Sequence, residues 1–254
     1  MAFKPLVILD FDGVVRDSGN VAGPGTRAAL NAAGLKAVYS PKDFRRMRGF
    51  KEFNNRRKAL EALYSVAVSG KSLKVLLRTA PQSILGLEKR FPVPKAVLDE
   101  MEGANRKAIA KEILKSPPVK YALAALKKLG KIARLAVVSD SYRRGVTRWM
   151  RKEGLNGFFE AVLCREDVPE MKPSPEGILA VLEKLRAKPG PGIFYVGDAE
   201  SDMVAAKRAG VAAIGVLGGM ASRKMLIKAG ARKVFGGLDA FAEWLRGVSQ
   251  YKNA

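Results

Sequence analysis

The chain has no histidine and only one cysteine, Cys164, among its 254 residues. Without histidine there can be no Ser-His-Asp triad and no imidazole general base, so proton transfer must fall to carboxylates, lysine or tyrosine. A single cysteine cannot form an internal disulfide, and it has no histidine with which to build a zinc site. This cysteine usage is typical of a reducing compartment, and we expect a cytoplasmic protein.

Long apolar runs are also missing. Apolar residues make up 48% of the chain, but no uninterrupted run approaches the roughly 20 residues that a membrane helix needs. The first segment, MAFKPLVILDFDG, has an apolar run before its aspartate that is too short for a secretory signal. We therefore expect a soluble globular protein that has no membrane partner.

Acidic residues are scarce relative to basic ones, with 24 Asp plus Glu against 46 Lys plus Arg and a net charge of +22. Such a chain attracts anions over long distances. The basic residues occur throughout the sequence. The sequence has no purely basic tail, and aromatic residues are not interleaved with the basic ones as in a surface that stacks nucleic-acid bases. An anionic partner is therefore expected, and direct nucleic-acid binding is not favoured.

Five short apolar runs have the pattern of strands that are buried on both faces of a parallel sheet. They lie at residues 6–9, 135–138, 161–163, 193–196 and 212–216. Helical patterns separate the later runs, which predicts repeated βα units. The fold class that follows is α/β, with a Rossmann-like three-layer parallel-sheet core formed by residues 1–17 and 116–254.

Residues 18–115 show helical patterns and no comparable strand, so we expect a mainly α-helical cap domain inserted after the first strand. Its helices are expected at residues 26–33, 52–68 and 94–114. In the core, one helix is expected to begin at the N-cap Ser116 and to end at Gly130. A second helix is expected to follow Asp198 and to end at Gly210.

The motif DFDGVVRDS places Asp10 and Asp12 on either side of Phe11, where the first apolar run ends. In an extended chain alternate side chains point to opposite faces, so the two carboxylates are expected on one side. Such a pair is costly unless a cation neutralises it or one member stays protonated, and both conditions suit phosphoryl transfer. Gly13 allows a sharp turn and brings its N–H close to an incoming anion. A plain strand-ending turn has the same local pattern.

A second acidic motif, GDAESD, follows the fourth apolar run and contains Asp198 and Asp202 four residues apart. Oxygen ligands from two strand ends suit a hard cation. Mg²⁺ is favoured because it is commonly held by one or two carboxylates plus a substrate phosphate. The alternative for one of these acids is a plain helix N-terminal residue that the helix dipole stabilises.

Two further features follow the second and third apolar runs. In VVSDS, the Ser139 hydroxyl and the nearby backbone N–H groups around Asp140 can hold phosphate oxygens, although a helix cap has the same pattern. Lys172, fixed before Pro173, offers a cation against the charge of a transferring phosphoryl group. All four motifs follow successive strands, so they are expected to converge at the carboxyl edge of one sheet, where open α/β sheets bind ligands.

In order and approximate spacing, these motifs resemble those of the haloacid dehalogenase superfamily, in particular its phosphoglycolate-phosphatase-like and β-phosphoglucomutase-like branch. The resemblance covers nearly the whole chain, and it implies a Mg²⁺-dependent phosphatase that hydrolyses a small phosphate monoester, phosphoglycolate-like or another anionic phosphometabolite. It implies that Asp10 is the nucleophile that forms an aspartyl-phosphate and also a metal ligand. It implies that Asp12 is the general acid and base, and that its backbone carbonyl binds the metal.

The resemblance also implies roles for the other motif residues. Ser139 and Lys172 are expected to hold the phosphate, together with the loops at Gly13 and Asp140. Asp198 is expected to be a direct metal ligand, and Asp202 is expected to act on the metal through water or as a neighbour of the ligands.

Two features of this chain concern substrate selectivity. After Asp-x-Asp-Gly the family usually has Thr-Leu, whereas this chain has two valines and then Arg16, which is expected to have a structural role or to shape the substrate entrance. Residues 42–58 hold eight basic residues against two acids. Because the cap supplies selectivity in capped members, we hypothesise that Arg45, Arg46 or Arg48 contacts a second anionic group of the substrate.

Alternative functions remain open at this point. A sugar-phosphate mutase of the same family uses the same nucleophile, and the core motifs do not separate it from a phosphatase. A dehalogenase is not favoured, because Asp12 is the acid that phosphate-ester cleavage needs. A non-catalytic polyanion-binding or RNA-binding protein on this fold is also not favoured, because it has no need for two costly acidic pairs. The oligomeric state is unknown.

Overall fold

The computed structural model describes residues 4–19, 21–36, 39–48, 50–53, 55–219 and 221–251. The chain separates into two compact units, and each is described by itself. The sheet unit comprises Met1–Gly19 and Ser116–Ala254, and the helical unit comprises Asn20–Lys115. In the described part of the chain, no helix is both long enough and apolar enough to cross a membrane.

The sheet unit is built around a parallel sheet with the strand order β3-β2-β1-β4-β5-β6. The strands are β1 (Leu6–Leu9), β2 (Arg134–Val138), β3 (Ala161–Leu163), β4 (Ile193–Gly197), β5 (Ala212–Val216) and β6 (Lys233–Phe235). Strand β1 lies at the centre, where Leu6 is in register with Arg134 on one side and with Ile193 on the other. This order confirms the α/β parallel-sheet fold, and the strands at the five apolar runs were predicted to within one residue.

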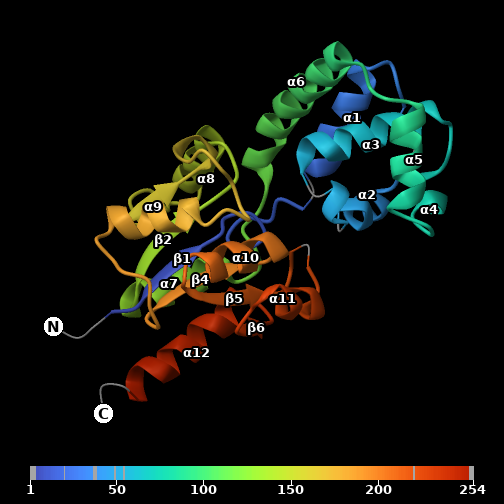
Figure 1. Ribbon diagram of the computed structural model, residues 1–254. Helices are drawn as coiled ribbons and strands as arrows, with labels where there is room; N and C mark the ends of the chain where they lie inside the picture. Colours follow the sequence, from blue (N-terminus) through green and yellow to red (C-terminus); the bar gives the residue numbers. More distant parts are fainter. Residues whose placement is uncertain are drawn as a thin grey trace. The chain divides into compact units, whose positions relative to one another are not determined.

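Helices cover both faces of this sheet, as Figure 1 shows. The helices of the unit are α7 (Ala122–Ile132), α8 (Arg143–Lys152), α9 (Glu176–Lys184), α10 (Glu200–Arg208), α11 (Arg223–Ala229), α12 (Leu238–Tyr251) and the short 3₁₀ helix η3 (Arg165–Asp167). Leu6 and Ile8 point to the face that helices α9, α10 and α11 cover. On the other face, Phe11 meets Trp149 of α8 edge to face, and Phe194 meets Phe241 of α12. The result is three layers.

Strand β1 is an uninterrupted apolar run because it is buried on both of its faces. All four residues of LVIL are buried, because each face of the strand packs against helices. The chain leaves this dry core at Asp10, which is the first polar residue after the strand. Polar side chains that directly follow the central strands therefore gather at one edge of the sheet.

The helical unit has its own apolar core. Its helices are α1 (Ala22–Ala32), α2 (Pro41–Arg48), α3 (Arg56–Val68), α4 (Leu73–Leu76), α5 (Gln82–Arg90), α6 (Lys95–Glu112) and the 3₁₀ helices η1 (Lys51–Phe53) and η2 (Ile113–Lys115). Phe44, Met47, Phe53, Leu60 and Leu63 are buried together at the centre of this core. A unit with a separate core can in principle fold alone.

One helix prediction was wrong. The segment after Ser116 is extended and pairs with the chain that leaves the first motif: Asp17 N–H donates to Pro117 O, and Val119 N–H donates to Val15 O. Helix α7 therefore begins only at Ala122, after Tyr121 in a left-handed conformation. Gly130 lies inside this helix rather than at its end. The prediction for the second helix was better, since α10 ends just before Gly210.

Candidate functional site

The candidate site lies at the carboxyl edge of the three central strands of the sheet unit. Asp10 follows β1, Ser139 follows β2, and Asp198 follows β4. These three residues are 6%, 3% and 5% exposed. Because β1 lies between β2 and β4, residues that are far apart in the sequence meet at this edge.

Three carboxylates form a cluster there. Asp10, Asp198 and Asp202 each offer an oxygen, and these oxygens lie within 4.8 Å of one another. All three side chains are buried, and all the donors are hard oxygens. This donor set fits a cation such as Mg²⁺, which prefers oxygen ligands, and it does not fit zinc, which prefers nitrogen and sulfur.

Lys172 is the cation of this cluster. Its Nζ lies 2.7 Å from Asp10 Oδ1 and 2.8 Å from Asp202 Oδ1. Burial would lower the pKa of Lys172, but the carboxylates of Asp10 and Asp202 outweigh burial and raise the pKa well above its usual value. The lysine therefore stays charged in the interior of the protein.

One lysine lies among three carboxylates in the cluster, and the pKa of Asp10 is raised. Burial raises this pKa well above its usual value, Lys172 opposes the rise, and the carboxylates of Asp202 and Asp198 add to it. A further cation beside Asp10 would favour its ionised form. The electrostatics of the site thus call for a positive charge in addition to Lys172.

Asp202 has little capacity left to bind a metal directly. Its Oδ2 accepts the backbone N–H groups of Asp198 at 3.1 Å and Ala199 at 3.0 Å. Its Oδ1 accepts from Lys172 and, at 3.2 Å, from the hydroxyl of buried Tyr195. Four donors fill the lone pairs of a carboxylate. We therefore favour Asp10 and Asp198 as direct ligands, with Asp202 holding Lys172 and the start of α10.

Two glycines make room for the Asp198 carboxylate. Gly13 has a φ of +82°, which disfavours other residues, and a Cβ at this position would overlap the carboxyl group of Asp198. A Cβ on Gly219 would overlap the same carboxyl group. The backbone thus approaches Asp198 closely from two loops, and these glycines leave its carboxyl group the space that it occupies.

Asp12 is held by a buried arginine. Its Oδ1 lies 2.8 Å from Arg16 Nε, and its Oδ2 accepts from Arg16 Nη2 at 3.0 Å and from Ser141 Oγ at 2.5 Å. Burial would raise the pKa of Asp12, but Arg16 and the hydroxyls of Ser141 and Ser18 outweigh burial and lower it. The side chain of Asp12 lies outside the carboxylate cluster, so its expected contribution to the metal through the backbone carbonyl stays a prediction.

Arg16 itself is placed differently from a residue at a substrate entrance. Its side chain is 0% exposed, and its guanidinium is already engaged by Asp12. This placement favours the structural role over a direct contact with substrate.

Ser139 and Asp140 make bonds within the protein. Ser139 Oγ accepts the N–H of Ser141 at 3.1 Å, which shapes the loop after β2. Asp140 Oδ1 accepts the N–H of Lys172 at 3.4 Å and so ties this loop to the one that carries the lysine. Burial raises the pKa of Asp140, and Lys172 opposes the rise. The expected contacts of both residues with phosphate stay predictions.

The basic residues expected to select the substrate belong to the helical unit. Arg45 lies in α2, but its side chain is outside the described residues. Arg46 is exposed on the same helix. Arg48 is partly buried beside the ring of Phe44, and burial together with Arg56 lowers the pKa of Arg48 to about 10. Their contact with a substrate stays a prediction.

Sequence reasoning missed three residues of the site. Ser141 is the second serine of VVSDS, and only the first was selected. Tyr195 interrupts the apolar run of β4 with a hydroxyl, which is a usable signal because a buried tyrosine needs a hydrogen-bond partner. Gly219 has no signal in the sequence, since glycines are common in loops.

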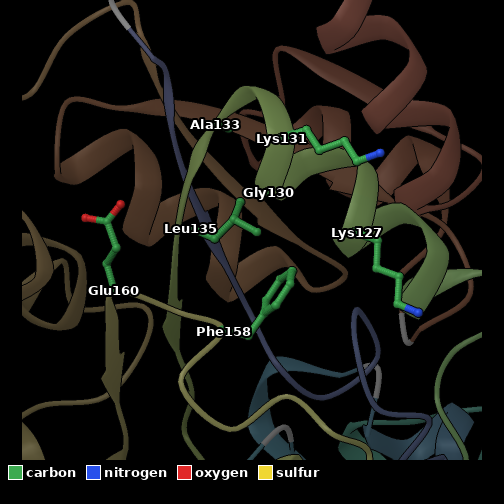
Figure 2. Close-up of a pocket in the computed structure, with 7 residues that line it drawn as sticks. All are labelled: Lys127, Gly130, Lys131, Ala133, Leu135, Phe158 and Glu160. Carbon is green, nitrogen blue, oxygen red and sulfur yellow. The ribbon is translucent and has the colours of Figure 1, made fainter.

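A hollow of about 480 Å³ lies elsewhere on the sheet unit (Figure 2). It is lined by Lys127, Gly130, Lys131, Ala133, Leu135, Phe158 and Glu160. Leu135 lies at the start of β2 and Glu160 directly precedes β3, so the hollow lies toward the amino ends of these strands. None of the residues of the candidate site line it.

Comparison with known proteins identifies relatives of the chain. A phosphorylated carbohydrates phosphatase of Thermotoga maritima is 33% identical over 129 residues, which are 50% of this chain and 58% of that protein. A phosphoglycolate phosphatase of Aquifex aeolicus is 36% identical over 94 residues, which are 37% of this chain and 43% of that protein. The chain thus matches about half the length of these curated relatives.

Solved structures share the fold over almost the whole chain. A crystal structure from Haemophilus somnus 129PT, described as a predicted phosphoglycolate phosphatase, has a TM-score of 0.76 at 18% identity and covers 96% of this chain and 99% of that one. A hydrolase from Pseudomonas syringae has a TM-score of 0.69 at 20% identity, with coverages of 96% and 99%. These likenesses concern the fold alone.

A family model matches residues 7–216, a range that runs from β1 to the end of β5 and includes every residue of the carboxylate cluster. The match covers well over half of the chain. The order of the four motifs and the parallel sheet that joins them agree with it. The chain belongs to the haloacid dehalogenase-like hydrolases.

Proposed function

We propose that this protein is a Mg²⁺-dependent phosphatase that hydrolyses a small phosphate monoester through an aspartyl-phosphate on Asp10. The observation that carries the proposal is the buried cluster at the carboxyl edge of the sheet, where Lys172 Nζ lies between Asp10 and Asp202 and Asp198 stands beside them. Phosphoryl transfer needs a nucleophilic carboxylate, a fixed positive charge and carboxylates that bind a metal ion. Asp10, Lys172 and the pair Asp10 and Asp198 can supply them.

In the first half of the reaction, a carboxylate oxygen of Asp10 forms a bond to phosphorus while the bond between phosphorus and the ester oxygen breaks. Asp12 gives a proton to the departing oxygen, so an alcohol leaves rather than an alkoxide. This step needs protonated Asp12, and Arg16 and the hydroxyl of Ser141 oppose it because they lower the pKa of Asp12, whereas the negative charge of a bound phosphate favours it. Lys172 stays charged and faces the phosphoryl oxygens, whose negative charge it stabilises. The hydroxyl of Ser139 is expected to donate to the same oxygens, whereas the N–H of Gly13 already donates to Arg16 O at 2.8 Å and does not support the phosphate contact expected for it.

In the second half, water attacks the phosphorus of the aspartyl-phosphate. Asp12 accepts a proton from this water, the bond between Asp10 and phosphorus breaks, and inorganic phosphate leaves. Arg16 and Ser141 stabilise the carboxylate form of Asp12, which suits this step. Mg²⁺ held by Asp10, Asp198 and the backbone carbonyl of Asp12 would neutralise charge on the phosphoryl group.

The expected substrate is a small metabolite that carries a second anionic group. Arg46 and Arg48 belong to a strongly basic part of the helical unit, and the net charge of +22 favours anions in general. The names of two relatives, a phosphoglycolate phosphatase and a phosphatase of phosphorylated carbohydrates, support substrates of this size. A cytoplasmic location fits the unpaired, buried Cys164.

The test is the release of inorganic phosphate from a panel of phosphoglycolate, sugar phosphates, pyrophosphate and p-nitrophenyl phosphate, with and without Mg²⁺. Asp10→Asn is expected to lower turnover by about 10³-fold or more, because it removes the nucleophile. Full turnover in this variant would refute the mechanism. Transfer of the phosphoryl group to another position of a sugar, without release of phosphate, would indicate a mutase instead.

A further inference from the structure

Arg16 is an unusual residue because its whole side chain is buried beside the candidate acid/base. It is 0% exposed, and its Nε and Nη2 bind the two oxygens of Asp12 at 2.8 Å and 3.0 Å. A guanidinium that contacts both oxygens of a carboxylate fixes the plane of that carboxylate as well as its position. The pair therefore determines how Asp12 is oriented.

The guanidinium is fixed in turn by helix α8, by the loop after β2 and by Phe11 of its own motif. Its Nη1 donates to the carbonyl of Gly145 in α8 at 3.3 Å, and its carbon lies 4.8 Å from the centre of the Phe11 ring. Ser141 Oγ lies 3.4 Å from Nη2 and also donates to Asp12 Oδ2. Arg16 thus lies between the loop after β2, helix α8 and the first motif.

The backbone fixes the spacing between the two partners. Arg16 O accepts the N–H of Gly13 at 2.8 Å, and Arg16 N–H donates to Phe11 O at 2.9 Å, which closes a tight loop around Asp12. Arg16 also forms a β-bridge with Pro118. Because both ends of the Arg16–Asp12 pair rise from this one loop, the orientation of Asp12 is built into the fold.

We propose that Arg16 is a positioning residue, which holds the Asp12 carboxylate in the orientation in which it exchanges a proton with the leaving group and with water. This inference rests on the proposed role of Asp12. The competing view is that Arg16 only neutralises a partly buried acid and so stabilises the fold. The two views predict different effects of Arg16→Met on the kinetic constants: only the positioning role makes the effect depend on the leaving group of the substrate and on the presence of Asp12.

The leaving group provides the first test. An alkyl phosphate such as phosphoglycolate needs a proton on its departing oxygen, whereas the nitrophenolate of p-nitrophenyl phosphate leaves readily without one. Arg16→Met is expected to lower kcat/KM for phosphoglycolate, or for the alkyl phosphate that the panel identifies, by about 10²-fold, a typical contribution of general acid catalysis. The kcat/KM for p-nitrophenyl phosphate is expected to change by less than about 5-fold, because kcat/KM reports only the steps up to the aspartyl-phosphate and leaves out the attack of water, which both substrates share.

A double-mutant cycle provides the second test. In an Asp12→Asn background, Arg16→Met is expected to lower kcat by less than about 3-fold, because a residue that acts only through Asp12 has nothing left to position. Arg16→Lys keeps the positive charge but lacks the planar guanidinium that binds two oxygens at once. Its kcat is expected to lie between those of the wild type and Arg16→Met. Arg134→Met is the matched control, since Arg134 makes a bidentate pair with Glu160 away from the site and its loss is expected to leave kcat unchanged.

Equal losses of kcat/KM on both substrates, or an undiminished loss in the Asp12→Asn background, would overturn the proposal. If Arg16→Met does not fold, Arg16→Lys and Ser141→Ala carry the same comparison, because each removes only part of the grip on Asp12. Failure of the proposed function is detected separately, by a wild type that is inactive on the whole panel or by full turnover in Asp10→Asn. An active wild type with an inactive Asp10→Asn and a normal Arg16→Met would refute the Arg16 proposal alone.

Discussion

Replacing Lys172 by methionine is the most direct perturbation of the carboxylate cluster. The ammonium group lies in two ion pairs, and the side chains of Lys172, Asp10 and Asp202 are 6%, 9% and 1% exposed. Removing one partner of a buried pair leaves an uncompensated charge and costs about 3–5 kcal/mol. Because Lys172 serves two carboxylates, we expect a loss of free energy of unfolding toward the upper end of this range.

Urea unfolding followed by tryptophan fluorescence measures this loss in the sheet unit. The chain has two tryptophans, Trp149 and Trp244, and both belong to the sheet unit. With a slope of about 2–3 kcal/mol per molar urea, a loss of about 4 kcal/mol moves the midpoint of unfolding down by about 1.3–2 M. The shape of methionine resembles that of lysine without its charge, so a cavity does not explain the shift.

Added Mg²⁺ sharpens the test. A divalent cation at Asp10 and Asp198 supplies part of the charge that the variant lacks. The difference in urea midpoint between Lys172→Met and the wild type is therefore expected to become smaller as the Mg²⁺ concentration rises. Lys128→Met is the control, since Lys128 pairs with Glu243 on the exposed surface and its midpoint is expected not to move. A midpoint for Lys172→Met as close to the wild type as that of the control, or a gap that widens with Mg²⁺, would refute the reasoning.

Three further predictions concern single residues. Gly219→Ala is expected to weaken Mg²⁺ binding measured by calorimetry, because its Cβ overlaps Asp198, whereas Gly236→Ala, which has open space, is expected to have no effect. Burial and the charge of a neighbouring glutamate raise the pKa of Glu88, so the folded state loses stability as pH rises above the usual value of about 4.3. The free energy of unfolding of Glu88→Gln is therefore expected to equal that of the wild type near pH 4 and to exceed it at pH 7 by less than about 1 kcal/mol. Denaturation followed by circular dichroism measures both values, and an equal difference at the two pH values would contradict this. Burial raises the pKa of the Cys164 thiol to about 11, so its alkylation by iodoacetamide at pH 8 is expected to be about 10²-fold slower than in denatured protein, and equal rates would contradict the burial argument.

Most of the sheet could be predicted from the sequence, because strands buried on both faces leave uninterrupted apolar runs. Strand β6 could not, since Lys233 opens it and the strand lies at the edge of the sheet, where one side has no neighbour. The false helix start at Ser116 has a similar cause. Serine followed by proline favours a helix locally, but pairing of Pro117 and Val119 with the first motif outweighs that preference.

The candidate site could be predicted as a set of residues but not as a set of contacts. Carboxylates that directly follow neighbouring parallel strands must meet, and this argument correctly brought Asp10 and Asp198 together. Nothing in the sequence says that four donors surround Asp202, because two of them are backbone N–H groups. Arg16 and Asp12 are four residues apart, but they lie outside any helix, so their spacing alone did not predict that they pair.

The two buried cations of the site bind different carboxylates. Lys172 binds Asp10 and Asp202, and Arg16 binds Asp12. The exposed basic residues that give the chain its charge of +22 act at long range and are screened by salt within about 8 Å, so they attract anions without distinguishing these acids. Buried pairs at contact distance are screened much less, and they assign a different environment to each acid. Asp10, the proposed nucleophile, therefore shares its cation with a neighbouring acid, whereas Asp12, the proposed acid/base, has an arginine to itself.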